Sequence, residues 1–117
     1  MAGTTTSRSP VDEAVAGLLA HSRYEVLPLD GIEEQVLAHV PRDVTLTVTV
    51  SPTRGLEPTL ALTARLLGHG YAVVPHLSAR LVESHEHLAD LVSRLGEMGV
   101  VDVFVVALLL LLFLFIP

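Results

Sequence analysis

One segment of the chain joins a buried-strand pattern to side chains that could do chemistry. Residues 71–74 predict a short strand, and Pro75 and His76 follow it directly. A proline has no N–H to donate to a neighbouring strand, so we expect the strand to end before Pro75. His76 would then lie at the rim of a sheet, where α/β proteins bind their ligands. The segment therefore predicts a binding site at the carboxyl end of this strand.

Two further strands carry side chains that could contribute to such a site. Glu25 lies in the apolar segment 24–28, where burial would favour the protonated acid and suit it to donate a proton. An outward-facing carboxylate on an edge strand explains the same pattern equally well. Thr49 lies at the end of the next strand and could hydrogen-bond a cofactor. Thr45, Thr47 and Thr49 also alternate as ordinary strand-forming residues.

Two other clusters of polar residues have simpler explanations. Arg54, in the loop 51–55, could hold a phosphate or carboxylate together with backbone amides, but a solvated turn explains the same residues. His85 and His87 form a His-x-His pair, and residues two apart on a helix point in different directions. We therefore expect no metal site in this chain.

The elements that must position these residues alternate between strand and helix patterns. Strands are expected to begin near residues 24, 44, 71 and 100. Helices are expected from Pro10 behind the cap Ser9, over 30–39 and 57–67, and up to Gly99 behind Ser84 or Ser78. Repeated β–α units predict an α/β fold with a parallel sheet, either doubly wound or closed into a barrel.

Composition limits the size of the fold and its partners. The chain has 117 residues, enough for one domain whose core is built mainly from Leu, Val and Ala. A net charge of −6 without a basic cluster argues against nucleic acid as a partner. The chain has no cysteine, which is compatible with a reducing cytoplasm. Residues 1–9 are small and polar, lack the apolar core of a secretory signal, and are expected to be disordered.

An apolar run without charges covers residues 103–116. As a helix it would span about 21 Å at 1.5 Å per residue. A bilayer core needs roughly 30 Å, so the run is short for a membrane anchor. We expect residues 10–107 to form the domain and residues 108–117 to be an apolar tail foreign to it. The alternative is a small non-catalytic α/β protein attached to a membrane by this tail.

Three segments together resemble the catalytic barrel of the methylenetetrahydrofolate reductase family. They are Tyr-Glu-Val-Leu-Pro at 24–28, Val-Thr-Val at 48–50 and Val-Pro-His-Leu-Ser at 74–78. The similarity covers about residues 22–107. It implies a (β/α)8 barrel that reduces 5,10-methylenetetrahydrofolate to 5-methyltetrahydrofolate with NAD(P)H, usually through FAD. It also implies that Glu25 protonates the folate substrate, and that Thr49 and His76 contact the cofactor.

The chain departs from this family after the fourth strand. The family continues there with a glycine–aspartate turn, whereas Val106 and Ala107 lead into a run of leucines. A complete barrel needs about 250 residues, so we expect a partial (β/α)8 barrel of about four β–α units. We expect this fragment to lack the activity of the intact family. Another flavin-linked barrel oxidoreductase is a further alternative.

Overall fold

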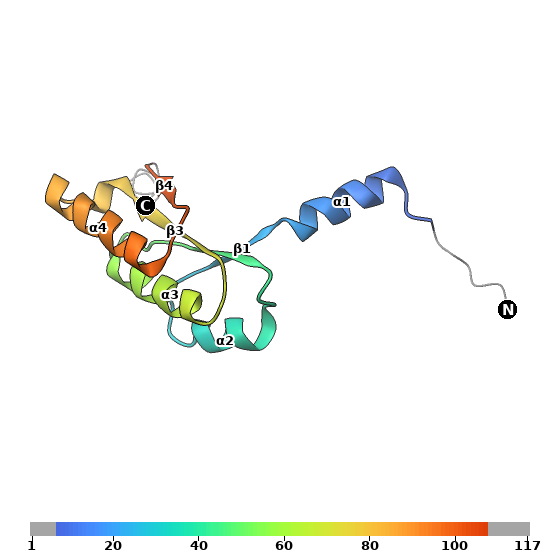
Figure 1. Ribbon diagram of the computed structural model, residues 1–117, viewed down its shortest axis with the longest axis horizontal. Helices are drawn as coiled ribbons and strands as arrows, with labels where there is room; N and C mark the ends of the chain where they lie inside the picture. The colour runs from blue at the N-terminus through green and yellow to red at the C-terminus, as the bar shows by residue number, and fades with distance from the viewer. Residues whose placement is uncertain (1–6, 108–117) are drawn as a thin grey trace, which may run out of the picture.

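The computed structural model describes residues 7–107 and shows an α/β fold (Figure 1). The helices are α1 (Pro10–Ala20), α2 (Ile32–His39), α3 (Glu57–Gly68) and α4 (His85–Met98), with the short 3₁₀ helix η1 at Ala79–Leu81. The strands are β1 (Arg23–Val26), β2 (Thr45–Val48), β3 (Val73–Ser78) and β4 (Phe104–Val106). The expected alternation of helices and strands is therefore confirmed.

The four strands form one sheet in the order β1-β2-β3-β4, and every neighbouring pair is parallel. Parallel neighbours require a crossover, which α2, α3 and α4 supply in turn. Helix α3 contacts both α2 and α4, so the three helices form one layer beside the sheet (Figure 1). The expected parallel sheet is confirmed, and its strands lie side by side in the order in which they follow one another along the chain.

The core lies between the sheet and this helical layer. Alternate strand residues such as Leu46 and Val48 face the helices and are fully buried. Helix α3 is central to the layer, because its leucines pack on both halves of the sheet. The buried residues form two clusters: Val26, Val36, Leu46, Val48, Leu62, Leu66, Tyr71 and Val73 in one, and Val50, Leu56, Leu60, Leu77, Leu91 and Leu95 in the other. Burial of each such side chain contributes about 1.5–3 kcal/mol, so this layer supplies most of the stability.

The end of the third strand differs from the sequence prediction. Strand β3 continues through Pro75 to Ser78, so His76 lies within the strand and the prediction of a strand end at Val74 was wrong. The reason lies in the pairing. Residues up to Pro75 pair with β2, whereas His76 and the residues after it pair with β4 on the other side. The proline therefore ends the pairing with one neighbour but not the strand.

Helix α1 forms as the sequence predicts, but none of its residues is buried within the described part of the chain. The Ser9 hydroxyl accepts a hydrogen bond from the amide of Asp12 at 3.1 Å, and the Asp12 carboxylate accepts one from the amide of Ser9 at 3.3 Å. The helix buries no residue and extends away from the body of the protein (Figure 1). Its apolar residues are therefore exposed, among them Leu18 at 75 %.

Both ends of the chain extend beyond the residues that the structure describes. Residues 1–6 of the expected disordered segment and the whole expected tail, 108–117, lie outside the described residues. The apolar run 103–116 is described only as far as residue 107. Between residues 7 and 107, no helix combines the length and the apolar character that crossing a bilayer requires.

Candidate functional site

Glu25, Thr49 and His76 line one cavity although they come from three different strands. The cavity has a volume of about 470 Å³ and lies on the face of the sheet opposite the helices. Its lining consists of Glu25, Leu27, Pro28, Leu29, Thr49, Val50, Ser51, Pro52, Arg54, His76, Phe104 and Val106. We call this side of the sheet, which carries Glu25, Thr49, His76 and Phe104, the open face. The three candidate residues from the sequence are thus brought together.

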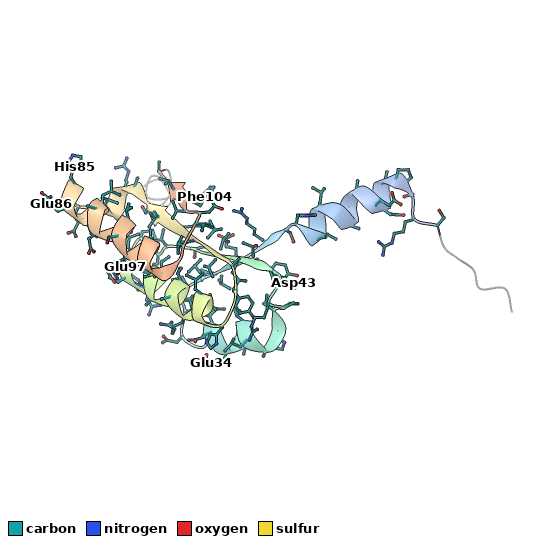
Figure 2. All side chains as sticks on the ribbon, viewed as in Figure 1. Glu34, Asp43, His85, Glu86, Glu97 and Phe104 are labelled. Atoms are coloured by element: carbon teal, nitrogen blue, oxygen red, sulfur yellow. The ribbon has the colours of Figure 1, made fainter. Side chains whose placement is uncertain are left out.

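The strand register explains why these side chains meet. Val48 lies opposite Pro75, so the next residues, Thr49 and His76, are level and point to the open face. His76 lies opposite Phe104. Phe104 lies on β4, at the edge of the sheet (Figure 2). Thr49, His76 and Phe104 therefore form a row across three strands.

His76 lies half-buried in the middle of this row. Its ring is 5.0 Å from the ring of Phe104, centroid to centroid, with the planes tilted by 41°. Burial lowers the pKa of the His76 imidazole below its ordinary value, and the negative charge of Glu25 opposes that shift in part. The imidazole is therefore neutral at pH 7, so one ring nitrogen can accept a hydrogen bond and the other can donate one.

Glu25 lies on β1, which is an edge strand within the described chain, and its side chain is exposed. The structure therefore places this residue as an outward-facing carboxylate on an edge strand, and not as a buried acid. It lies opposite Thr47, one row nearer the amino ends of the strands than Thr49. The carboxylate can reach a ligand in the cavity while remaining in contact with solvent.

The rim of the cavity is held in place by hydrogen bonds from the neighbouring loop and helix. An Nη1–H of Arg54 donates to the carbonyl oxygen of Pro28 at 2.9 Å, which joins the loops that follow β1 and β2. The buried Thr59 hydroxyl of α3 donates to the carbonyl oxygen of Thr49 at 2.8 Å. These contacts fix the backbone of the rim and leave the half-buried Thr49 side chain on the open face.

Sequence reasoning missed Phe104 as a site residue and gave Arg54 a looser role than it has. Phe104 belongs to the last predicted strand, and its position opposite His76 becomes visible only with the β3–β4 register. Aromatic residues are rare in this chain, and that was the one available signal. Arg54 combines a cation at the rim with a structural hydrogen bond to the β1 loop.

The His-x-His segment has a structural role. His87 Nδ1 accepts a hydrogen bond from the amide of Glu83 at 2.9 Å, and the amide of His87 donates to the hydroxyl of Ser84 at 3.0 Å. Ser84 is thus the cap of α4, which resolves the choice between Ser84 and Ser78. Across residues 7–107 no group of three or more His, Asp or Glu side chains is placed to hold a metal ion.

The cavity presents a carboxyl group, a neutral imidazole, a hydroxyl and a guanidinium around an apolar floor. These groups suit a planar, partly polar ligand that exchanges a proton with its surroundings. No protein-family model matches the chain, and neither a curated protein nor a solved structure matches it.

Proposed function

We propose that the chain is a partial (β/α)8 barrel of the methylenetetrahydrofolate reductase type, located in the cytoplasm. The sequential strand order β1-β2-β3-β4 supports a barrel, because a doubly wound sheet reverses its strand order at a switch point. The helical layer on one side of the sheet supports it as well, since a barrel carries all its helices outside. The open face then corresponds to the interior of the barrel.

The observation that carries the functional proposal is the convergence of Glu25, Thr49 and His76 on one cavity. The family resemblance assigns these three residues, from three separate segments, to a single site. In barrel enzymes the ligands bind at the carboxyl ends of the strands. Thr49 follows the last residue of β2, and His76 lies in the carboxyl-terminal half of β3.

The chemistry of the lining suits a nicotinamide or flavin ring with a folate beside it. The cavity is within the size range of small-molecule sites, and its apolar floor suits a flat ring. Thr49 and neutral His76 would hydrogen-bond the heteroatoms of the ring and hold it against Leu27. When bound, reduced FAD or NAD(P)H supplies a hydride. Glu25 would donate the proton to the substrate nitrogen, and Arg54 would pair with a carboxylate or phosphate of the ligand.

The described residues supply only one wall of such a site. Phe104 and Val106 mark its limit on β4, and β1 marks it on the other side. A single copy would thus leave a bound ring open to water, and excluding water is part of hydride-transfer catalysis. We therefore expect ligand binding by the chain with little or no turnover. The alternative of a non-catalytic protein attached to a membrane by residues 103–116 is supported by the exposure of β4, where that run begins.

Titration of the purified full chain with FAD and, separately, with NADH tests the proposal by absorbance and fluorescence. We expect saturable binding of at least one of them, weakened about tenfold or more by His76→Ala because the ring loses its central contact. His39→Ala, on the exposed surface of α2, is the matched control and should leave binding unchanged. Glu25→Gln should bind the ring as the parent chain does, because Glu25 is assigned to the folate substrate and not to the ring. Absence of any binding by a well-folded sample contradicts the proposal.

A further inference from the structure

Both edges of the sheet are open in the part of the chain that the structure describes. Strand β1 pairs only with β2, and β4 pairs only with β3. Unpaired strand edges carry free N–H and C=O groups that bind another strand readily. The two edges run in the same direction, so β4 of one molecule can pair in parallel with β1 of another.

The strand registers supply a more specific constraint. Arg23 of β1 lies opposite Thr45 of β2. When the registers of the next two pairs are continued, Thr45 is level with Ala72, and Ala72 is level with Val100. Strand β4 itself begins at Phe104, four residues beyond Val100. Measured at their first residues, the strands therefore climb by four residues from β1 to β4.

This climb is half of what a closed barrel of eight strands requires. The (β/α)8 barrel has a shear of about 8 residues around eight strands, which is about 4 residues for each set of four. A second sheet with the same climb would supply the other four strands of the barrel. The first residue of its β1 would then be level with the first residue of β4 in the first sheet.

We propose that two copies of this chain close into one eight-stranded barrel, with β4 of each copy paired to β1 of the other. The proposal rests on the barrel architecture proposed above but not on the folate chemistry. The two junctions are related by a twofold axis, so both edges of each copy become paired at once and no edge remains. With the observed climb, Phe104 lies opposite the partner's Arg23, and Val106 lies opposite the partner's Glu25.

Charge complementarity at the junction supports this pairing. Arg23 and Asp102 are both exposed, and both line a second hollow of about 430 Å³ near the amino ends of the strands. Asp102 precedes Phe104 by two residues, so along an extended strand it belongs to the same face. The partner's Arg23 would therefore lie between an aromatic ring and a carboxylate, which are both favourable neighbours of a guanidinium. The twofold axis repeats this contact at the second junction.

The opposite face of β4 carries apolar side chains that no helix covers in the described part of the chain. Val103 and Val105 alternate with Phe104, so they point toward the helical side, yet they are 42 % and 62 % exposed. In a (β/α) barrel, the helix that precedes a strand packs outside the junction between that strand and the strand before it. The helix that precedes β1 is α1, whose apolar residues are exposed in a single copy. The partner's α1, turned back at its link to β1, is therefore the helix that covers Val103 and Val105.

Closure would also complete the candidate site. The open face of one copy would be opposite the open face of the other, and the cavity that holds His76 and Thr49 would gain a second wall from the partner's strands. Each site would then be shielded from solvent, as hydride transfer requires. The dimer, and not the single chain, would be the unit in which turnover is to be looked for.

Light scattering coupled to gel filtration, and sedimentation velocity, test the pairing on the full chain. We expect a dimer of about twice the 12.5 kDa chain mass, without larger species. Arg23→Glu or Asp102→Arg alone should weaken dimerisation about tenfold or more, because each places like charges at both junctions. The double variant Arg23→Glu/Asp102→Arg should recover an affinity within about threefold of the parent, since it exchanges the charges and preserves the pair.

Two charge-reversal controls leave the proposed junctions intact. Glu34→Arg changes the exposed surface of α2, and Glu97→Arg changes the exposed surface of α4 (Figure 2). Neither should alter the dimer affinity. A monomeric parent chain overturns the proposal, and so does a double variant that fails to recover. Larger oligomers that ignore the charge reversals also overturn it and would indicate association through apolar residues.

The outcome is separable from that of the functional proposal. A dimer that recovers in the charge exchange but binds neither FAD nor NADH supports the closed barrel and contradicts the reductase chemistry. A chain that binds a cofactor as a monomer contradicts the pairing alone.

Discussion

The two faces of the sheet use the same strands for different purposes. On the covered face, Leu46 and Val48 are fully buried under the helices. On the open face, Thr47 and Thr49 alternate with them along the same strand and remain half-exposed. Since successive strand residues point to opposite sides, one short strand can supply packing with one set of residues and chemistry with the other. Changes on the two faces should therefore have different effects, stability on one and binding on the other.

The polar groups on the covered face are hydrogen-bonded within the protein, unlike those on the open face. The Tyr71 hydroxyl donates to the carbonyl oxygen of Val40 at 2.6 Å and accepts from Arg42 Nη1 at 2.6 Å. The Arg42 guanidinium lies 4.6 Å from the centre of the Tyr71 ring. No buried side-chain polar atom in residues 7–107 lacks a hydrogen-bond partner. The open face instead presents its hydroxyl, imidazole and carboxylate to a cavity.

The largest expected effect is on the covered face. Leu66→Ala should lower the free energy of unfolding by about 2–5 kcal/mol, because Leu66 is fully buried in the cluster between α3 and the sheet. Val92→Ala, at a 59 % exposed position on α4, is the matched control and should change it by less than about 0.5 kcal/mol. Urea unfolding followed by circular dichroism measures both. Equal losses in the two variants would mean that the helical layer is not the core.

An intermediate loss of stability is expected from removing the Tyr71 hydroxyl, which is a hydrogen-bonded polar group on the covered face. Tyr71→Phe should cost about 1–2 kcal/mol, because it removes the hydroxyl that satisfies the Val40 carbonyl and receives the Arg42 donor. Tyr24→Phe, at a half-exposed position on β1, should be close to neutral. The same urea titration compares them at pH 7. If Tyr71→Phe is as neutral as Tyr24→Phe, the hydroxyl does not stabilise the fold.

The smallest expected effect is the pH dependence of stability caused by His76 on the open face. Burial lowers the folded-state pKa of His76, so the unfolded chain binds a proton more readily than the folded one. Stability is therefore unaffected well above the unfolded pKa of about 6.5 and falls as the pH drops through that value. We expect a decrease in melting temperature between pH 7.5 and 5.5 that is smaller in His76→Gln. The lowered pKa of Glu33 acts at lower pH, below its ordinary value of 4.5, and leaves this window clear. An identical slope in both proteins would contradict the assignment to His76.

The sequence predicts the order and type of the elements well because local signals specify them. Ser9 and Ser84 cap their helices through hydrogen bonds to nearby amides, and such contacts depend on residues three positions apart. Alternation over 44–50 predicts β2 and the face of each of its residues. Local sequence therefore sufficed for the α/β class and for much of the core.

The parts that the sequence could not predict all depend on strand neighbours. The extension of β3 past Pro75 requires pairing with β4, which begins almost thirty residues later. The exposure of Glu25 depends on β1 being an edge strand, and Phe104 enters the site only through its register with His76. None of these is set by nearby residues, because sheet registers join distant segments of the chain.

The sequential strand order also has a consequence for how the chain assembles as it is synthesised. Each strand after β1 pairs with the strand made immediately before it, so a growing chain can add one β–α unit at a time to an edge that already exists. Contacts between segments close in sequence form quickly, and no strand has to wait for a distant partner from its own chain. Of the four strands β1 is synthesised first, and no later strand among the described residues pairs with its outer edge.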